Sequence, residues 1–277
     1  MGKEELLQHY FSHLNLDVQE ANYTKCPKTW REINFVPSFN RLYLIEQGEG
    51  EIQVGGQRYC PSAHDLVIMP AQVKQSYTTI SDATYLKYWV HFTAVVGERS
   101  LFQLLDTPVV LHLTADAFIH AQHKMQELRK IHMERAWTSP LRKRAAMLQL
   151  LELYFSCIGL QQIQLRSKDA DKLNVIIAYM AEHIDQRITV QELARQLHLH
   201  PNYFITYFRE HMGESPIQYM NKMKLEHAKQ LLLTGELHIH EVAERVGMDA
   251  YYFSRQFKEF TGFSPSGYRA SHRAEGK

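Results

Sequence analysis

The sequence is short of three things that define whole classes of protein: cysteine, charge of one sign and long apolar segments. Its three cysteines, Cys26, Cys60 and Cys157, lie far apart and form no C-x-x-C pair. That spacing fits neither a disulfide framework nor a cysteine-based zinc site. A reducing compartment is therefore expected.

The apolar segments are too short for a secretion signal or a membrane span. The first residues, MGKEELLQHYF, lack the apolar core of a signal peptide. The longest apolar region, 145–160, contains Gln149 and Glu152 and is shorter than a bilayer crossing requires. We expect a cytoplasmic protein with no membrane partner.

Charge is nearly balanced, with 31 Lys and Arg, 30 Asp and Glu and a formal net charge of +1 at pH 7. No polybasic or acidic tail is indicated, and taken alone the balance disfavours nucleic acid as a partner. The 277 residues, 45% of them hydrophobic, are enough for two domains that each bury a core.

The first third of the chain is predicted to form short β-strands. Gly48 and Gly50 follow one expected strand, Gly55-Gly56 forms a tight hairpin turn, and Pro70 ends an apolar run. Short strands at regular intervals with such turns are typical of a small sandwich or barrel. The expected strands are 42–47, 51–54, 57–60, 66–69, 77–80 and 85–92.

After residue 114 the apolar period becomes helical. Residues 115–136 are predicted to form one helix, and Ser139-Pro140 opens a second helix over 141–160. The second helix has an apolar stripe wide enough for a dimer contact, although packing inside the domain also explains it. The stripe consists of Met147, Leu148, Leu150, Leu151, Tyr154, Phe155 and Ile158.

The two expected domains are joined by a polar segment. Residues 165–172 lose all apolar periodicity and are predicted to be a linker. The linker separates an N-terminal domain at 1–164 from a helical C-terminal domain at 173–277.

The C-terminal domain contains an internal repeat. Residues 192–219 align without a gap to residues 241–268, at an offset of 49, with ten identical positions. Agreement of this kind indicates one supersecondary unit used twice. The identical pairs include Ala194/Ala243, Phe204/Phe253, Phe208/Phe257 and Gly213/Gly262.

Each copy has the features of a helix-turn-helix unit. Thr189 and Glu192 have the spacing of a capping box at the start of the first helix. Apolar residues and one small alanine then face inward, so that a second helix can cross closely. In the turn, Gly247 suits a left-handed backbone, whereas His198 accepts some strain at the equivalent position.

The second helix of each unit is predicted to read DNA. His200 and Asp249 cap these helices, and phenylalanines anchor them to the core. A helix held by its aromatic face and exposing polar side chains at its N-terminal end suits the major groove. Asn202 and Arg255 suit bidentate base contacts, and Lys258 suits phosphate. The full predicted set is Asn202, Ile205, Thr206 and Arg209 in the first unit and Tyr251, Ser254, Arg255 and Lys258 in the second.

A long helix is expected to join the units. It covers 216–233, is capped by Ser215 and ends near Thr234-Gly235. Two recognition helices on such a spacer can enter successive major grooves about 34 Å apart.

These residues resemble the AraC/XylS-type bacterial transcription regulators. The resemblance covers 175–269 and is most specific in the second unit, where Gly247, Asp249 and the run Tyr252-Phe253-Ser254-Arg255 follow the family signature. The family's usual arginine in the linking helix is Lys224 here. The resemblance implies an α+β multi-domain fold. Its N-terminal domain would be a cupin-like β-barrel with dimerisation helices, and its C-terminal domain would be all-α.

The N-terminal strands resemble, more diffusely, the effector barrel of such regulators. In residues 85–92 every second residue shares a face. By resemblance to sugar-sensing members, aromatic faces there would stack on a small-molecule effector such as a carbohydrate. A role of Trp89 as a core residue explains its position equally well. Trp30 and Arg31 are weaker candidates. The predicted effector-binding residues are Arg41, Tyr43, Glu46, Tyr77, Trp89 and His91.

No catalytic or metal-binding constellation stands out. Cupin enzymes bind metal through His-x-His and a nearby Glu, whereas the matching segment 70–77 has no histidine and places Gln75 at the histidine position. The His-x-His pairs at 198–200 and 238–240 lack acidic or cysteine partners at metal spacing and are interpreted as exposed or capping residues. We predict no metal, no cofactor and no enzyme activity.

The sequence therefore predicts a sequence-specific DNA-binding transcription regulator, acting as an activator under a small-molecule effector. Its expected partners are double-stranded DNA, a second copy of the chain and RNA polymerase. Control by a partner protein, or no effector at all, is an alternative, and a metal-dependent cupin enzyme is a disfavoured one. Residues 170–277 contain thirteen Lys and Arg and thirteen Asp and Glu, so this domain has no net charge. The placement of Arg209, Arg255 and Lys258 on the predicted reading helices, and not the net charge, indicates DNA binding.

Overall fold

Two units make up the chain, and each has its own core. The computed structural model describes residues 3–134, 136–166, 168–234 and 237–274. One unit is Tyr10–Ser167, and the other combines Met1–His9 with Lys168–Lys277. The chain thus pairs a β-sheet-rich N-terminal region with a helical C-terminal domain, as the α+β prediction required.

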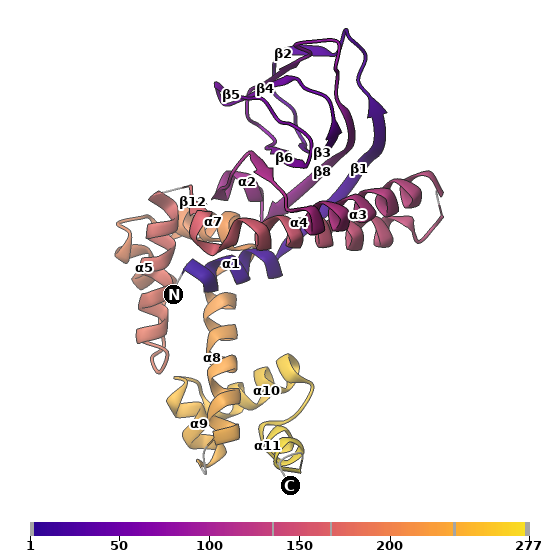
Figure 1. Cartoon of the computed structure of the whole chain (residues 1–277). Coiled ribbons are helices and arrows are strands. Elements are labelled where there is room, and N and C mark those ends of the chain that lie inside the picture. Colours follow the sequence, from indigo (N-terminus) through magenta and orange to yellow (C-terminus); the bar gives the residue numbers. More distant parts are fainter. Residues whose placement is uncertain (1–2, 135, 167, 235–236, 275–277) are drawn as a thin grey trace. The chain divides into compact units, whose positions relative to one another are not determined.

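The unit Tyr10–Ser167 is built on two antiparallel sheets (Figure 1). The larger has the order β1-β8-β3-β6-β11, with β9 paired to β8, and the smaller has the order β2-β7-β4-β5. A buried cluster that includes Tyr43, Val67 and Ile52 packs side chains of both sheets together. The strands of these sheets are β1 (Leu14–Lys25), β2 (Arg31–Phe35), β3 (Asn40–Gln47), β4 (Glu51–Val54), β5 (Gln57–Tyr59), β6 (Asp65–Met69), β7 (Gln75–Thr78), β8 (Leu86–Val96), β9 (Arg99–Ser100) and β11 (Val110–His112).

The six strands predicted from the sequence are confirmed, with shifted ends. β7 begins two residues earlier than predicted, and β8 continues four residues further. β1, β2 and β11 were missed. β1 contains an irregularity between Val18 and Glu20, which breaks the alternation that would have revealed it.

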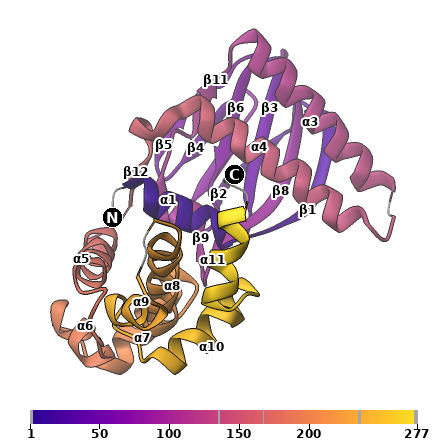
Figure 2. The ribbon, with the colours of Figure 1, turned by 90° about the horizontal axis from the view of Figure 1, so that it is seen from below.

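Two long helices cover one face of the larger sheet (Figure 2). α3 (Ala115–Glu134) and α4 (Ser139–Gln162) pack side by side and both contact β1. Arg135, inside the first predicted helix, lies outside the described residues. The short helix α2 (Leu101–Leu104) contacts β8 and β9, and β10 (Leu105–Asp106) pairs with β12 (Gln164–Leu165).

The wide apolar stripe of α4 is mainly an internal packing surface. Five of its seven residues are buried, and Leu148 is the one that stays exposed. Packing within the domain therefore explains most of the stripe. Outside it, Trp137 and Leu141 are large exposed apolar residues at the start of this helix.

The other unit consists of helices. Two short helix pairs are joined by α8, which confirms the predicted linking helix, and Gly235 lies outside the described residues. The helices are α5 (Lys168–Glu182), α6 (Val190–Gln196), α7 (Pro201–Met212), α8 (Pro216–Thr234), α9 (Ile239–Arg245), α10 (Ala250–Thr261) and α11 (Pro265–Ala274).

The boundary between the units differs from the predicted one. Within the predicted linker 165–172, Leu165 belongs to β12 and Lys168 begins α5, and Ser167 lies outside the described residues. At the other end, α1 (Lys3–Ser12) contributes its first residues to the helical unit. There His9 Nε2 lies 2.8 Å from the Met212 carbonyl oxygen, and its ring contacts Tyr219 edge to face.

None of the helices that the structure describes combines the length and the apolarity of a bilayer span.

Candidate nucleic-acid interface and effector pocket

The first helix-turn-helix unit begins at the predicted capping box. Thr189 is the N-cap of α6, its backbone N–H donates to the Glu192 carboxylate at 2.7 Å, and its hydroxyl accepts from the Glu192 backbone N–H. Buried Leu193 and Ala194 form the inner face of α6. His200 then caps α7 by accepting from the Asn202 N–H. These predictions are confirmed.

The second unit repeats this geometry 49 residues later. His238 donates its backbone N–H to Glu241 at the start of α9, as Thr189 does to Glu192. Asp249 caps α10 by accepting from the N–H groups of two residues in its first turn. Left-handed glycines, Gly213 and Gly262, end α7 and α10 with φ of 77° and 81°.

The turns of the two units share a left-handed residue but differ in how closely it is packed. His198 has a φ of 55° and is exposed, and Gly247 has a φ of 58°. A Cβ on Gly247 would lie 2.3 Å from the Asp185 carbonyl oxygen, closer than any real contact. Only glycine can occupy the second turn, whereas the first tolerates a side chain at the cost of some strain.

The eight predicted DNA-contacting residues all lie on α7 and α10. Six of them are exposed, with Tyr251 81% accessible, whereas Ile205 and Ser254 are half-buried. Phe204 and Phe208 of α7 and Phe253 and Phe257 of α10 are fully buried behind them. Each helix therefore presents its predicted residues opposite an aromatic anchor.

Two of the predicted hydroxyls also bond within their own helix. Thr206 Oγ1 donates to the Asn202 carbonyl, and Ser254 Oγ donates to the Ala250 carbonyl. In these conformations both hydroxyls offer a ligand acceptor lone pairs, not a proton. Sequence reasoning missed Tyr203, which is 59% exposed at the N-terminal end of α7. Its identity with Tyr252 in the repeat was the available signal.

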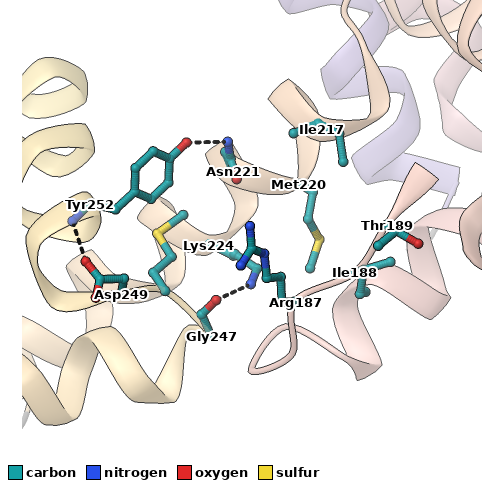
Figure 3. Close-up of a pocket in the computed structure, with 11 residues that line it drawn as sticks. Arg187, Ile188, Thr189, Ile217, Met220, Asn221, Lys224, Gly247, Asp249 and Tyr252 are labelled. Carbon is teal, nitrogen blue, oxygen red and sulfur yellow. Dashed lines mark hydrogen bonds between the residues drawn. The ribbon is translucent and has the colours of Figure 1, made fainter. Parts of the chain in front are cut away.

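Lys224 of α8 connects the two helix-turn-helix units. Lys224 is buried, and its amine donates to the Gly247 carbonyl at 3.1 Å (Figure 3). The same amine donates to the Gln186 carbonyl at 2.7 Å. Burial lowers the pKa of this amine to about 8. One side chain thus bonds the segment before α6 to the turn before α10.

A cleft of about 570 Å³ lies beside Lys224 (Figure 3). Asn221 Nδ2 donates to the Tyr252 hydroxyl at 3.4 Å across it. Residues of α8, of the segment before α6 and of the second turn form its walls. They are Arg187, Ile188, Thr189, Ile217, Met220, Asn221, Lys224, Gly247, Met248, Asp249 and Tyr252.

In the sheet-containing unit Tyr10–Ser167, called the β unit below, a cavity of about 250 Å³ brings most of the predicted effector residues together. Arg41, Tyr43, Tyr77, Trp89 and His91 all line it, and the weaker candidate Trp30 lines it as well. The remaining lining residues, which sequence reasoning did not select, are Thr24, Cys26, Pro27 and Lys87.

Glu46 does not lie in this cavity, which corrects its assignment. Its carboxylate accepts hydrogen bonds from the Tyr23 hydroxyl and from Gln122 of α3. The reason is the alternation of side chains along β3. Glu46 is an even number of residues from Leu44 and shares its face of the strand, whereas Arg41 and Tyr43 lie on the opposite face. Arg31 lines a separate pocket beside the strand β7.

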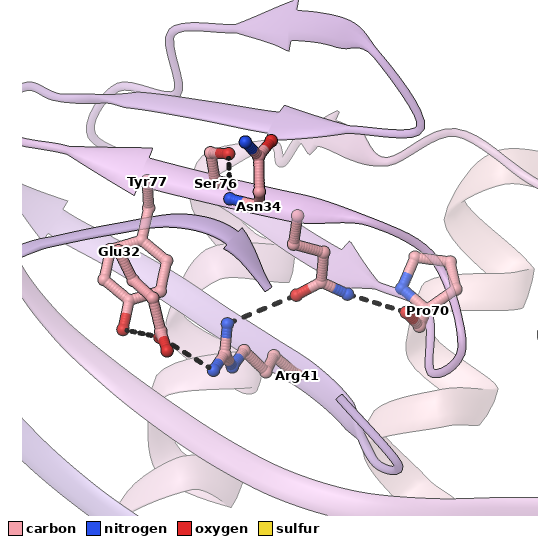
Figure 4. A network of polar contacts seen from close by, with 7 residues as sticks. Glu32, Asn34, Arg41, Pro70, Ser76 and Tyr77 are labelled. Carbon is pink, nitrogen blue, oxygen red and sulfur yellow. Dashed lines mark hydrogen bonds and ion pairs between the residues drawn. The ribbon is translucent and has the colours of Figure 1, made fainter. Parts of the chain in front are cut away.

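Arg41 is the centre of a polar network at one end of the cavity (Figure 4). Its Nη1 donates to Gln75 Oε1 at 3.2 Å, and its Nη2 lies 3.7 Å from the Glu32 carboxylate. That carboxylate also accepts from the Tyr77 hydroxyl at 2.7 Å. Gln75 donates from Nε2 to the Pro70 carbonyl at 2.7 Å and so bridges Arg41 to the end of β6.

Aromatic rings form the rest of the wall. Trp30 stacks on Tyr77 with ring centroids 4.3 Å apart, and Trp89 Nε1 donates to Thr24 Oγ1 at 3.1 Å. Burial, with Arg41 and Lys87 nearby, lowers the pKa of His91 to about 4, so its imidazole is neutral at pH 7. A neutral imidazole and several π faces suit a ring-shaped ligand.

The His-x-His pairs are placed as structural residues. His200 caps α7, and His238 and His240 stack on each other with ring centroids 5.6 Å apart.

Comparison with known proteins places this arrangement in a family. A helix-turn-helix domain family model matches residues 193–271, which include all eight predicted DNA contacts. The raffinose operon transcriptional regulatory protein RafR of Pediococcus pentosaceus is 25% identical over 235 residues, covering 83% of this chain and 84% of that protein. The lactose operon transcription activator of Staphylococcus xylosus is 23% identical over 238 residues, covering 82% of each chain.

A solved structure is similar to the C-terminal region. It is the C-terminal domain of AraT, a response regulator from Geobacillus stearothermophilus, 36% identical over 38% of this chain and 88% of that chain, with a TM-score of 0.36. The helix-turn-helix match and the similarity to transcription regulators over most of the chain identify a DNA-binding transcription regulator. These similarities agree with the AraC/XylS-type resemblance noted from the sequence.

Proposed function

We propose that this regulator reads two successive major grooves with α7 and α10 and activates transcription when its β unit binds a small effector. The observation that supports it most is the matched pair of reading helices, with equivalent caps, equivalent ends and exposed polar faces. In this proposal Asn202 and Arg255 contact bases, and Arg209 and Lys258 contact phosphates.

Arg255 tests the reading role. Arg255→Ala is expected to weaken binding to a selected operator by about 1–3 kcal/mol and to relax the base preference at one position. Gel-shift titration of the full chain against the selected operator and a scrambled one measures both effects. Arg245→Ala, an exposed arginine on α9, is the matched control. Equal operator affinity for wild type and Arg255→Ala would remove Arg255 from the interface.

The cavity of the β unit is the proposed effector site, and the bound molecule is proposed to be a carbohydrate or a related metabolite. Support comes from the aromatic lining of the cavity and from relatives that are named for raffinose and lactose operons. Trp30 and Trp89 line the cavity, so a bound effector should change tryptophan emission and operator affinity together. A regulator controlled by a partner protein would show neither change with any small molecule.

A dimer is the proposed active form. The support is the set of large apolar residues left exposed on α4 and just before it, namely Trp137, Leu141, Leu148 and Leu160. Leu141→Asp with Leu148→Asp is expected to shift light-scattering mass from dimer to monomer. An unchanged mass would place the dimer contact elsewhere or exclude a dimer.

A further inference from the structure

Lys87 of β8 is a buried cation without an anion of its own. The residue is 3% exposed, and its Nζ lies 3.5 Å from the ring centroid of Tyr43 and 4.0 Å from that of Trp30. Among the described residues, none accepts a hydrogen bond from Nζ or pairs with it as a carboxylate. Two aromatic faces replace only part of the hydration that an ammonium loses on burial.

Arg41 brings a second cation to the same cavity. It is 4% exposed, and its Nε has no hydrogen-bond partner within the described part of the chain. Glu32, 3.7 Å from Nη2, balances the guanidinium in part. The cavity therefore has one partly balanced guanidinium and one amine with no carboxylate beside it, on walls that are otherwise mainly aromatic.

We propose that the effector of this cavity carries an oxyanion, a carboxylate or a phosphate, and that Lys87 binds this group. The inference rests on the proposed role of the cavity as the effector site and specifies the chemical class of its ligand. The body of the ligand stacks on the aromatic wall formed by Trp30, Tyr77 and Trp89.

The charge state of Lys87 agrees with this arrangement. Burial lowers the pKa of its amine to about 7, with a smaller contribution in the same direction from Arg41. An oxyanion beside Nζ stabilises the protonated amine, so binding of the acid and protonation of Lys87 favour each other. A neutral sugar would not stabilise the protonated amine in this way.

The size of the cavity limits the ligand. Pockets for drug-sized molecules have volumes of about 300–1,000 Å³. This cavity, at about 250 Å³, suits one ring with one acidic substituent. Glucuronate and glucose 6-phosphate are therefore suitable probes, and glucose is the uncharged control with the same ring.

Calorimetric titration of the full chain with these three probes tests the inference. We expect at least one of the two acids to bind about tenfold or more tightly than glucose. The acid that binds distinguishes carboxylate from phosphate. Glucose binding as tightly as both acids would overturn the inference and leave the effector role of the cavity intact.

A charge-removing variant assigns the effect to Lys87. Lys87→Met keeps the length of the side chain, and we expect it to bind the acid about tenfold or more weakly and glucose unchanged. Lys74→Met, an exposed lysine of the same unit, should bind like wild type. If Lys87 only supports the fold, Lys87→Met lowers the melting temperature and both kinds of probe lose affinity together. That outcome contradicts the inference.

The pH dependence of the unliganded protein separates these roles further. The ionisable groups around Lys87 are Arg41 and Tyr43 from the neighbouring strand β3, Cys26 from the loop after β1, and His91 from β8 itself. Because the folded state releases this proton near pH 7 and the unfolded state near its ordinary pKa of 10.5, stability should rise with pH above 7. Lys87→Met should lack that rise in stability. Lys224 contributes a similar rise to both proteins, so its contribution cancels when the stability of the variant is subtracted from that of wild type at each pH.

Fractionated metabolites give a test that does not depend on the choice of probe. A small-molecule extract of the producing cells is split on an anion-exchange resin, and each fraction is added to the operator-binding assay. Activity in the retained fraction supports the inference. Activity only in the unretained fraction overturns it, and activity in neither fraction contradicts effector control itself.

Discussion

The two helix-turn-helix units have one backbone plan but differ in how their turns are packed. The first turn has His198 at its left-handed position, and this side chain is exposed. The second turn has Gly247 pressed against the Asp185 carbonyl, and its own carbonyl accepts from Lys224. The second turn is thus part of the contact between the units, whereas the first turn serves its own unit alone.

Gly247→Ala should have the largest effect, because it combines a left-handed Cβ with a 2.3 Å contact to backbone. We expect a loss of about 2 kcal/mol or more of unfolding free energy. Urea unfolding followed by far-ultraviolet circular dichroism measures this loss. Tryptophan fluorescence would not report on the helical unit, because Trp30, Trp89 and Trp137 all lie in the β unit.

The matched change in the first turn is His198→Ala. Histidine and alanine pay a similar penalty for the left-handed backbone, so we expect a change within about 0.5 kcal/mol. Equal losses for Gly247→Ala and His198→Ala would show that the two turns are packed alike.

Lys224→Met should have the next largest effect. It leaves the Gln186 and Gly247 carbonyls without their donor, which costs about 1–3 kcal/mol. Lys224→Arg should recover most of that loss, since a guanidinium can donate to both oxygens. Lys222→Met on the same helix is the control. Chemical unfolding gives the stabilities, and Lys224→Met with wild-type stability would mean that the amine does not connect the units.

His198→Gly should have the smallest effect and the opposite sign. Glycine removes the left-handed penalty but increases the entropy of the unfolded chain, so a gain of a few tenths to about 1 kcal/mol is expected. Parallel unfolding curves of the variant and wild type measure it. A destabilised variant would reveal contacts of the imidazole that outweigh backbone strain.

The C-terminal unit could be predicted closely from the sequence because its signals are local. Thr189 with Glu192, His200 and Asp249 each act within three residues along the chain, and the repeat checks every assignment twice. The packing of Lys224 could not be predicted, since Gln186 and Gly247 are 38 and 23 residues away from it.

The β unit was less predictable because its site depends on long-range pairing. Period-two alternation placed Lys87, Trp89 and His91 on one face, and the structure confirms this, but it did not indicate that Lys87 has no carboxylate beside it. The same alternation on β3 places Glu46 on the face opposite to that of Arg41 and Tyr43, so its assignment to the cavity was wrong. Cys26 and Trp30 join the site from a loop whose path the sequence pattern does not define.

The Lys224 bridge has a consequence for the DNA sites that this protein can use. Since one amine joins the segment before α6 to the turn before α10, the two reading helices should keep a set separation. Each inserted base pair rotates one contacted groove relative to the other by about a tenth of a turn. We expect promoters of this regulator to tolerate base changes between the two contacted boxes and to lose function when a single base pair is inserted there.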